Sequence, residues 1–208
     1  LKRLSFACQW LKNGRCLLGN VIWSDETTVK SNPNTRRDSH WTPGKVRKPQ
    51  LKVHSGGFSQ MFWGCISEHG TGPLITIDGT MDGEQYSTVL KEWLLPELEI
   101  AQQLFDGNWQ IMQDNAPCHR TLDIREYLAE RNVPILDWPP YSPDLNTIEN
   151  IWNWMKSKMP PVSSQNELTA EFLKIWDSIT PEMCANYCSN YDRRLKAVKE
   201  AKGRATKY

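Results

Sequence analysis

Hydrophobic residues in the first half of the chain fall into short runs that end at turn signals. The run at 21–25 ends in a carboxylate, and the runs at 60–66 and 73–78 are bounded by turns that contain glycine. Short apolar runs between turn signals are typical of strands. The first half therefore predicts three strands that follow one another along the chain.

After residue 80 the apolar positions recur at steps of three and four. This period predicts an amphipathic helix over 83–105, with a kink or break at Pro96. Shorter apolar runs predict a fourth strand at 109–114 and a fifth at 133–138, separated by a helix over 121–132. Strands and helices therefore alternate, as they do in an α/β fold.

The proline-rich segment 139–143 ends this pattern, because proline removes a backbone donor and disfavours helix in the residue before it. A helix is predicted to begin near Asn146 or Thr147, since either residue can cap a helix N-terminus. Two further helices are predicted, over about 163–179 and 180–202. The chain thus adds C-terminal helices to the α/β part.

The composition supports a single folded domain. The 208 residues are 39% hydrophobic and 24% charged, which is enough to bury a core and excludes a disordered or fibrous chain. Lys and Arg number 25 against 24 Asp and Glu, a net charge of +1, so any contact with DNA must come from local basic patches. No apolar stretch approaches the roughly 18 residues of a membrane span, and the sequence predicts a soluble, intracellular protein.

The six cysteines are scattered through a chain too large to need disulfide bonds for stability, which favours free thiols. Cys184 and Cys188 are expected to be buried thiols, because the second pair of ligands typical of a structural zinc site is missing. The chain begins with leucine inside an expected helix, so further residues are expected before it.

Basic residues gather in the segment 32–55, which follows neither the helix period nor the strand period. Long irregular segments in compact domains are usually functional or disordered, so a contact with DNA or a partner and a solvated loop both remain open. The last predicted helix is also basic, and its charged face is either solvated or bound to a phosphate backbone. The candidate DNA-contact residues are Arg36, Arg37, Lys45, Arg47, Lys48, Lys52, Arg193 and Arg194.

Two carboxylates end predicted strands. If the first and fourth strands are parallel neighbours, Asp25 and Asp114 lie side by side at the edge where α/β sheets bind ligands. Glu149 lies one turn into the helix after the fifth strand, and that helix could deliver it to the same place. Carboxylates so close need a cation, and oxygen ligands without His or Cys suit Mg²⁺ or Mn²⁺, two of which would assist phosphoryl transfer. Spacing alone leaves open that all three are ordinary surface acids.

The segments around these carboxylates, 23–26, 113–119 and 142–152, read WSDE, QDNAPCH and SPDLNTIENIW. They resemble the three catalytic blocks of the Tc/mariner superfamily of DNA transposases, and the 34 residues between Asp114 and Glu149 are the spacing typical of its Tc-like branch. The similarity covers essentially the whole chain. Thr147 departs from the pattern, which usually has proline there, and is expected to loosen the entry to the helix slightly.

The resemblance implies an RNase H-like fold in one catalytic domain over 1–208, with a five-stranded mixed sheet flanked by helices and extra C-terminal helices. The segment 32–55, an insertion between strands one and two, would match the clamp loop that reaches the partner subunit in the paired-end complex of mariner-type transposases. The helix-turn-helix domains that precede the catalytic domain in this family are absent from this sequence.

The resemblance also implies cut-and-paste transposition, in which metal-dependent hydrolysis at transposon ends is followed by transfer of the freed 3′-hydroxyl into target DNA at TA. Asp25, Asp114 and Glu149 would be the catalytic residues and would bind Mg²⁺ as two ions, for which Mn²⁺ can substitute. The partners implied are DNA and a second copy in a paired-end complex, with no membrane, and the location implied is nuclear. Cys118 and His119 receive no metal role.

Two alternatives stand beside an active transposase. One is a domesticated derivative that binds DNA or a protein without cutting; the three carboxylates argue against this loss of chemistry without excluding it. The other is a plain nuclease such as a ribonuclease H, against which the Tc-like spacing counts heavily.

Overall fold

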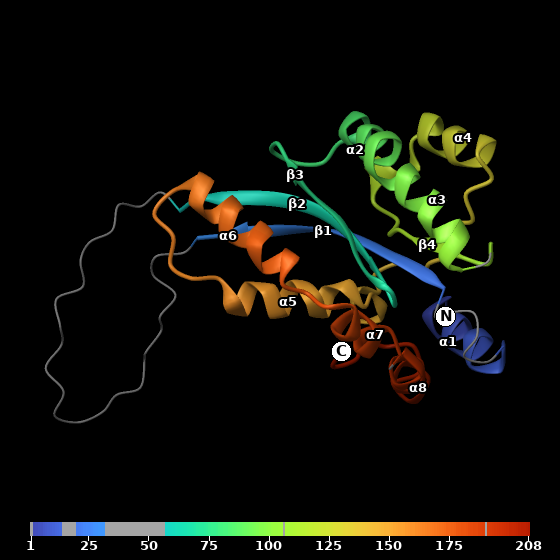
Figure 1. Cartoon of the computed structure of the whole chain (residues 1–208). Helices are drawn as coiled ribbons and strands as arrows, with labels where there is room; N and C mark the ends of the chain where they lie inside the picture. Colours follow the sequence, from blue (N-terminus) through green and yellow to red (C-terminus); the bar gives the residue numbers. More distant parts are fainter. Residues whose placement is uncertain (1, 14–19, 32–56, 106, 190) are drawn as a thin grey trace, which may run out of the picture.

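A mixed sheet lies at the centre of the molecule (Figure 1). Its strands are β1 (Val21–Lys30), β2 (Ser59–Ser67), β3 (Gly70–Ile77) and β4 (Gln110–Met112). Within the described residues the sheet has four strands in the order β3-β2-β1-β4. The β3-β2 and β2-β1 pairs are antiparallel, whereas β1 and β4 are parallel. This parallel pair confirms the arrangement on which the expected carboxylate cluster depends.

The computed structural model describes residues 2–13, 20–31, 57–105, 107–189 and 191–208. The basic segment 32–55 lies outside the described residues. So do its candidate DNA-contact residues, which are Arg36, Arg37, Lys45, Arg47, Lys48 and Lys52. In the described part of the chain, none of the helices combines the length and the apolar character needed to cross a membrane.

The fifth predicted strand, 133–138, is wrong. This segment makes one isolated parallel bridge, between Ile135 and Ile111 of β4. The amide of Ile111 donates to the carbonyl of Pro134, and the amide of Leu136 donates back to the carbonyl of Ile111, both at 2.8 Å. Proline has no amide hydrogen to extend the ladder, and the two prolines after Trp138 end the extended segment, so pairing stops at a single residue.

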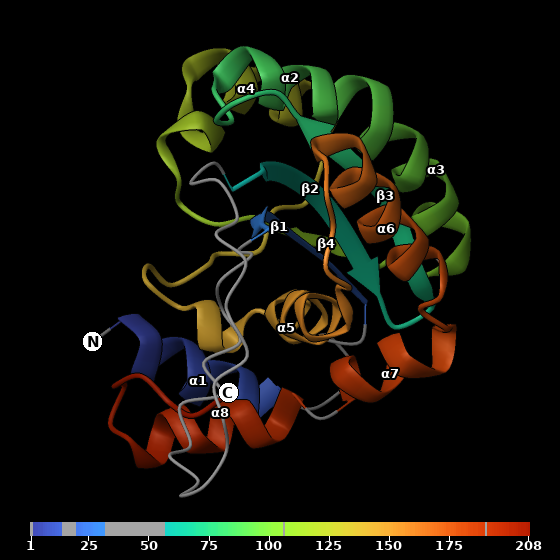
Figure 2. The same cartoon turned by 90° about the vertical axis from the view of Figure 1, so that its left-hand side faces the viewer.

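Side chains of alternate strand residues enter two hydrophobic cores, one on each face of the sheet, as the two-residue period of a strand requires. Ile22 and Trp63 belong to one core, and Trp23 and Phe62 belong to the other. Figures 1 and 2 show the helices on both faces. The first core is covered by α2 (Gly83–Val89), a π-helical turn (Leu90–Leu94), α3 (Leu95–Leu104) and α4 (Leu122–Glu130). The second core is covered by α5 (Ile148–Lys158), α6 (Gln165–Asp177), α7 (Pro181–Ser189), α8 (Tyr191–Glu200) and α1 (Lys2–Asn13).

The break expected at Pro96 takes the form of the π-helical turn that joins α2 to α3. In this turn the amide of Leu95 donates to the carbonyl of Leu90, five residues back. Proline at position 96 cannot donate and crowds the preceding turn, and a π turn is a recurrent way to absorb such a disturbance without ending the helix.

The range 180–202, predicted as one helix, holds two helices, α7, which ends at Ser189, and α8, which begins at Tyr191. Both turn an apolar face toward the same core, with Cys184 and Cys188 on α7 and Leu195 and Val198 on α8. The apolar period therefore continues across the break, and it gives no signal of where one helix ends.

The turn that leads into α5 is fixed by both ends of the chain. Asp144 is 8% exposed, and its two carboxylate oxygens accept hydrogen bonds from the Arg3 guanidinium of α1, each at 2.7 Å. The backbone amide and the hydroxyl of Thr206 also donate to Asp144 Oδ2, at 2.9 and 2.7 Å. Figure 2 shows α1 and α8 side by side below α5. The start of α5 is thus held from outside the sheet.

Candidate active site

Asp25 lies on β1, and Asp114 follows β4, the neighbouring strand that runs in the same direction. The β1–β4 register pairs Trp23 with Met112. Asp25 follows Trp23 by two residues, and Asp114 follows Met112 by two residues. The hydroxyl of Ser24 donates to the carbonyl of Met112 at 2.8 Å, which ties the two chains together just before the carboxylates. The parallel pair therefore brings both aspartates to the edge at which β4 ends, although β1 itself continues to Lys30.

Glu149 reaches this edge because α5 is anchored to β1 on both sides of it. The Asn146 amide donates to the carbonyl of Ser24 at 3.2 Å, and the Trp152 indole Nε1 donates to Asp25 Oδ2 at 3.2 Å. The first turn of α5, which carries Glu149, lies between these two anchors.

The electrostatics show that the carboxylates are close enough to repel one another. Burial and repulsion from Glu149, Glu26 and Asp114 together raise the pKa of Asp25 well above its ordinary value, although the backbone amide of Glu26 opposes the shift. Burial also raises the pKa of Glu149. The structure thus brings together the three carboxylates that the sequence singled out.

No metal role is expected for His119 from the sequence, and the structure places it beside the carboxylates. The imidazole is 3% exposed. Its Nδ1 lies 2.9 Å from Asp114 Oδ1, and its Nε2 lies 3.2 Å from Glu26 Oε1. Burial alone would lower the pKa of His119, but its hydrogen bonds to Asp114 and Glu26 raise it to about 10. The charged ring therefore bridges two carboxylates and lowers the pKa of Asp114.

Lys156 is a second residue that the sequence analysis missed. It follows Glu149 by seven residues on α5, which places both on the same face of the helix. Burial lowers the pKa of Lys156, whereas the negative charges of Glu149 and Asp25 raise it. The ammonium group therefore lies within electrostatic reach of both carboxylates. The seven-residue spacing was the available signal.

The donor set fits a divalent cation in its chemistry. It consists of carboxylate oxygens, which hard cations such as Mg²⁺ and Mn²⁺ prefer, and mutual repulsion leaves negative charge for a cation to neutralise. Among the described residues, however, no group of three His, Cys, Asp or Glu side chains is arranged to hold a metal ion. One oxygen of Asp114 is already engaged, because Oδ1 lies 2.9 Å from His119 Nδ1 and accepts from the amide of Ala116 at 2.8 Å. The three carboxylates are near one another, but they are not arranged as a metal coordination sphere.

Comparisons with known proteins agree with this arrangement. The family described as "DDE superfamily endonuclease" matches residues 20–169. The Tcb1 transposase of Caenorhabditis briggsae is 35% identical over 99% of this chain and 77% of its own length. The Tc1 transposase of Caenorhabditis elegans is 34% identical over 100% of this chain and 77% of its own length. This chain belongs to the Tc/mariner family of DDE transposases.

Solved structures confirm the RNase H-like fold of this transposase domain. A pre-cleavage Mos1 transpososome matches with a TM-score of 0.81 at 16% identity, over 99% of this chain and 63% of the Mos1 chain. The Mos1 catalytic domain with raltegravir and Mg matches with a TM-score of 0.72 at 14% identity, over 99% of this chain and 96% of that one. Membership of the DDE family also carries dependence on a divalent metal, and Mos1 complexes have been solved with Mn and with Mg.

The two arginines expected to contact DNA from α8 differ sharply. Arg193 is exposed and remains a candidate. Arg194 is 4% exposed, and its guanidinium donates to the carbonyl of Asp144 at 2.8 Å and to the side chain of Asn150. Its expected DNA contact is therefore corrected to a structural role.

The two cysteines of α7, Cys184 and Cys188, are buried thiols, and burial raises their pKa values to about 11 and about 12.

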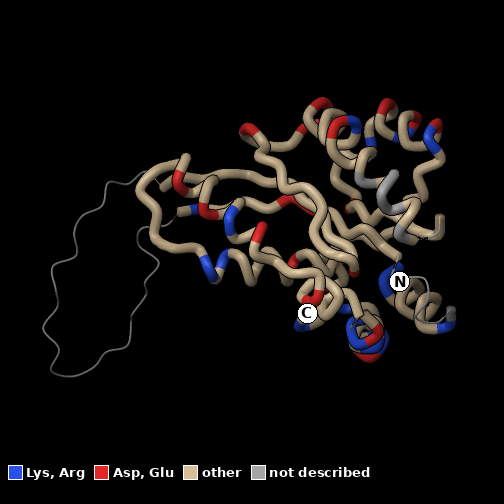
Figure 3. The backbone as a smooth tube through the Cα atoms, in the orientation of Figure 1, with Lys and Arg blue, Asp and Glu red and all other residues tan. Residues whose placement is uncertain are grey.

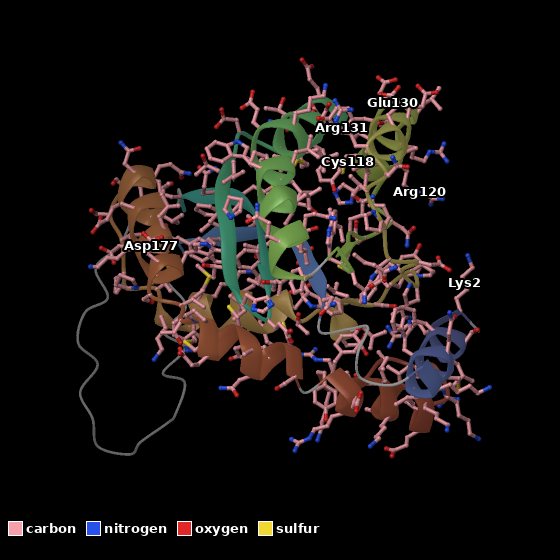
Figure 4. The ribbon with its side chains drawn as sticks, turned by 45° about the vertical axis from the view of Figure 1, so that its right-hand side comes forward. Lys2, Cys118, Arg120, Glu130, Arg131 and Asp177 are labelled. Carbon is pink, nitrogen blue, oxygen red and sulfur yellow. The ribbon has the colours of Figure 1, made fainter. Side chains whose placement is uncertain are left out.

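A hollow of about 390 Å³ opens beside Asp114, which is within the size range of ligand sites. Arg120 and Arg125 line the hollow. Asn115 and Trp138 also line it, and the Asn115 side chain donates to the carbonyl of Trp138 at 3.0 Å. Figure 4 shows Arg120 at the surface close to α4. Neither arginine forms an ion pair with another described residue. Figure 3 shows acidic and basic positions interspersed over α4 and α8. The pair of arginines at the hollow is therefore not part of a larger basic surface on these helices.

Proposed function

We propose that Asp25, Asp114 and Glu149 form the catalytic centre with which this transposase domain cuts phosphodiester bonds at transposon ends. The observation that carries the proposal is the convergence of three carboxylates from β1, the end of β4 and the first turn of α5. When bound, two Mg²⁺ ions, for which Mn²⁺ can substitute, would supply Lewis acidity to both the attacking and the leaving oxygen.

The surrounding side chains support these roles by holding the carboxylates. The Trp152 indole fixes one oxygen of Asp25, and His119 fixes one oxygen of Asp114. Because the pKa of His119 is raised to about 10, its positive charge persists at neutral pH and offsets the repulsion between Asp114 and Glu26. Lys156 supplies a further positive charge beside Glu149.

The reaction proposed has two phosphoryl transfers. In the first, a water oxygen attacks phosphorus at the transposon end, the bond to the 3′ oxygen breaks, and that oxygen leaves with a proton as a 3′-hydroxyl. In the second, the oxygen of this hydroxyl attacks phosphorus in target DNA at TA and loses its proton, while the phosphorus–oxygen bond to the target 3′ oxygen breaks and the 3′ oxygen leaves with a proton as a new hydroxyl. Because each step exchanges one such bond for another, no external energy source is required.

Assembly on DNA is part of the same proposal. Mos1 has been solved in paired-end complexes and in a strand transfer complex, which supports two copies of this domain acting on paired transposon ends in the nucleus. We propose a single catalytic domain over 1–208, with 32–55 as a clamp-like loop. Its basic residues would contact DNA or the partner copy, and Arg193 would add a phosphate contact from α8.

The path of the DNA strand is proposed to cross the hollow beside Asp114. Arg120 and Arg125 line the hollow without ion-pair partners among the described residues, and arginines of this kind bind phosphate readily. A strand that enters the carboxylate cluster would bring the phosphates next to the scissile one over these guanidinium groups. A domesticated derivative without cleavage activity is not favoured, because all three carboxylates are retained in their gathered positions.

The test is Mn²⁺ binding by calorimetry, with Mg²⁺ as competitor, combined with nicking of supercoiled plasmid DNA. Asp114→Asn is expected to lose Mn²⁺ binding and to nick at background rates, because it removes a metal charge with little change of shape. Asp177→Asn is the matched control, since Asp177 is an exposed acid at the end of α6 that does not line the hollow. Equal binding and nicking by wild type and Asp114→Asn would remove Asp114 from the site.

A further inference from the structure

The hydrogen bond from Trp152 to Asp25 joins α5 to β1 inside the carboxylate cluster. The indole Nε1 lies 3.2 Å from Asp25 Oδ2. The indole ring is fully buried, stacked on Trp176 at a centroid distance of 5.3 Å and an interplanar angle of 25°, and close to Phe172 at 6.2 Å. A ring packed in this way cannot change rotamer without opening the core, so its donor presents one fixed direction to Asp25.

The space for this ring comes from a missing side chain on β2. Gly64 is the residue paired with Asp25 across the β1–β2 ladder. A Cβ atom at Gly64 would lie 2.9 Å from Trp152 Cη2, 3.1 Å from Leu74 Cδ1 and 3.3 Å from Trp176 Cη2. The first of these distances is shorter than carbon atoms tolerate, so the ring reaches Asp25 only because position 64 lacks a Cβ.

The same face of α5 also carries the charges of the cluster. Trp152 follows Glu149 by three residues and precedes Lys156 by four, which are the spacings that align side chains along one side of a helix. One helix therefore carries a carboxylate and the indole that bonds to β1, with the exposed Lys156 one turn further along. The Trp152 ring is therefore one of the two anchors between which α5 carries Glu149 toward Asp25, the other being the Asn146 side chain.

Other tryptophans in the structure do not share this role. Trp176 donates its indole hydrogen to the backbone carbonyl of Gly72 at 3.1 Å, and Trp109 donates to the side chain of Gln102. The indole nitrogens of Trp23 and Trp63 are buried without a hydrogen-bond partner. Among the hydrogen bonds of the described residues, Trp152 is thus the indole that donates to a carboxylate, and its acceptor belongs to the candidate metal site.

We propose that Trp152 is a positioning residue for the metal site, and that Gly64 provides the gap in which its ring is seated. The inference rests on the proposed function, because it takes Asp25 as a metal ligand. Partners that hydrogen-bond to a ligating carboxylate fix its orientation and tune its affinity for the metal. Trp152 does so for Asp25 from the helix that also carries Glu149, so one contact orients one ligand and anchors the helix that carries another.

The test compares two substitutions of stacked tryptophans. Trp152→Phe keeps an aromatic ring and removes the donor to Asp25, whereas Trp176→Phe removes an indole donor from the same stack without touching a carboxylate. Trp152→Phe is expected to weaken Mn²⁺ binding, measured by calorimetry, on the order of tenfold. Trp176→Phe is expected to bind Mn²⁺ as wild type does. Plasmid nicking by Trp152→Phe should need more Mn²⁺ for half-maximal rate, with the rate at saturating Mn²⁺ largely recovered.

Gly64→Ala tests the proposal from the opposite side, because it displaces the ring without deleting the donor. It is expected to weaken Mn²⁺ binding in the same direction. Thermal unfolding of each variant separates loss of fold from loss of the site, since a purely structural role would lower the melting temperature of both tryptophan variants and leave their Mn²⁺ affinities equal.

The outcomes separate this inference from the function on which it rests. Wild-type Mn²⁺ affinity in both Trp152→Phe and Gly64→Ala, or an equal loss in Trp176→Phe, would overturn the positioning role. Absence of Mn²⁺ binding by the wild-type chain, or equal binding by wild type and Asp25→Asn, would overturn the metal site itself. Loss in Asp25→Asn, Trp152→Phe and Gly64→Ala, with Trp176→Phe unaffected, is the result expected.

Discussion

Asp144 and Asp25 are both withdrawn from solvent, yet their electrostatic surroundings are opposite. Burial alone would raise the pKa of Asp144, but hydrogen bonds from Arg3 and Thr206 hold it below the ordinary value. Burial also raises the pKa of Asp25, and the neighbouring carboxylates raise it further. The charged form of Asp144 is therefore stabilised within the chain, whereas the surroundings of Asp25 disfavour its charged form.

The difference separates a carboxylate that stabilises the fold, Asp144, from one that is proposed to bind a metal ion, Asp25. Asp144 receives a bidentate pair from Arg3 on α1 and two hydrogen bonds from Thr206 near the C-terminus, so the fold saturates it. Asp25 accepts from the Trp152 indole, a neutral donor that orients the group without cancelling its charge. An uncancelled charge in a fixed orientation is what a divalent cation needs from a ligand.

The largest effect is expected when the same substitution is made at both positions. Asp144→Asn should lower the free energy of unfolding by about 3 kcal/mol, because removing the charge of one partner leaves the other charge of a buried pair uncompensated. Asp25→Asn should leave the free energy of unfolding unchanged or higher, because it removes repulsion, while plasmid nicking falls to background. Urea denaturation and the nicking assay measure the two quantities. Equal losses of stability at both positions would erase the contrast.

A smaller effect is expected from pH. A carboxyl group whose pKa is lowered on folding stabilises the native state above its unfolded pKa, and that contribution is lost as the pH falls through the folded pKa. Asp144 has a lowered pKa relative to 3.8, so part of the stability should disappear below about pH 4. Denaturation from pH 7 to 2 should show a steeper acid loss for wild type than for Asp144→Asn. A wild-type acid loss retained in full by Asp144→Asn would assign it to other carboxylates.

The sequence supports the site better than it supports the contacts that hold the site. Glu149 in the first turn of a helix and Asp114 just beyond a short strand stand at positions that local patterns mark, whereas Asp25 ends the apolar run 21–25 but lies within β1, which continues to Lys30. The bond between Trp152 and Asp25 spans 127 residues, and the bonds between Arg3 and Asp144 span 141. A local pattern of apolar residues cannot predict pairs so far apart in the sequence. The role of Gly64, which leaves space for the Trp152 ring, becomes visible only in the structure, where Gly64 is paired with Asp25.

The incorrect predictions share a physical cause, which is tertiary structure overriding a local pattern. Residues 133–138 are apolar enough for a strand, but Pro134 removes the donor that a continuous ladder needs. Arg194 belongs to a helix whose charges suggested a solvated face, yet its guanidinium is drawn inward by the carbonyl of Asp144 and by Asn150. The apolar pattern at 133–138 thus fails because of a single proline, and the charge pattern of α8 gives no sign that one of its arginines is buried.

The smallest effect extends the comparison from carboxylates to arginines. Arg3 is saturated by Asp144, whereas Arg120 and Arg125 line the hollow beside Asp114 and form no ion pair with another described residue. Arg120→Ala combined with Arg125→Ala should weaken DNA binding and reduce the slope of log K against log salt by up to about 2, since each phosphate contact contributes about 0.9. Arg131→Ala is the matched control, because that guanidinium stacks over the Tyr127 ring at 3.8 Å. Fluorescence anisotropy with a DNA duplex at several salt concentrations measures the slope, and an unchanged slope in the double variant would place the DNA strand elsewhere.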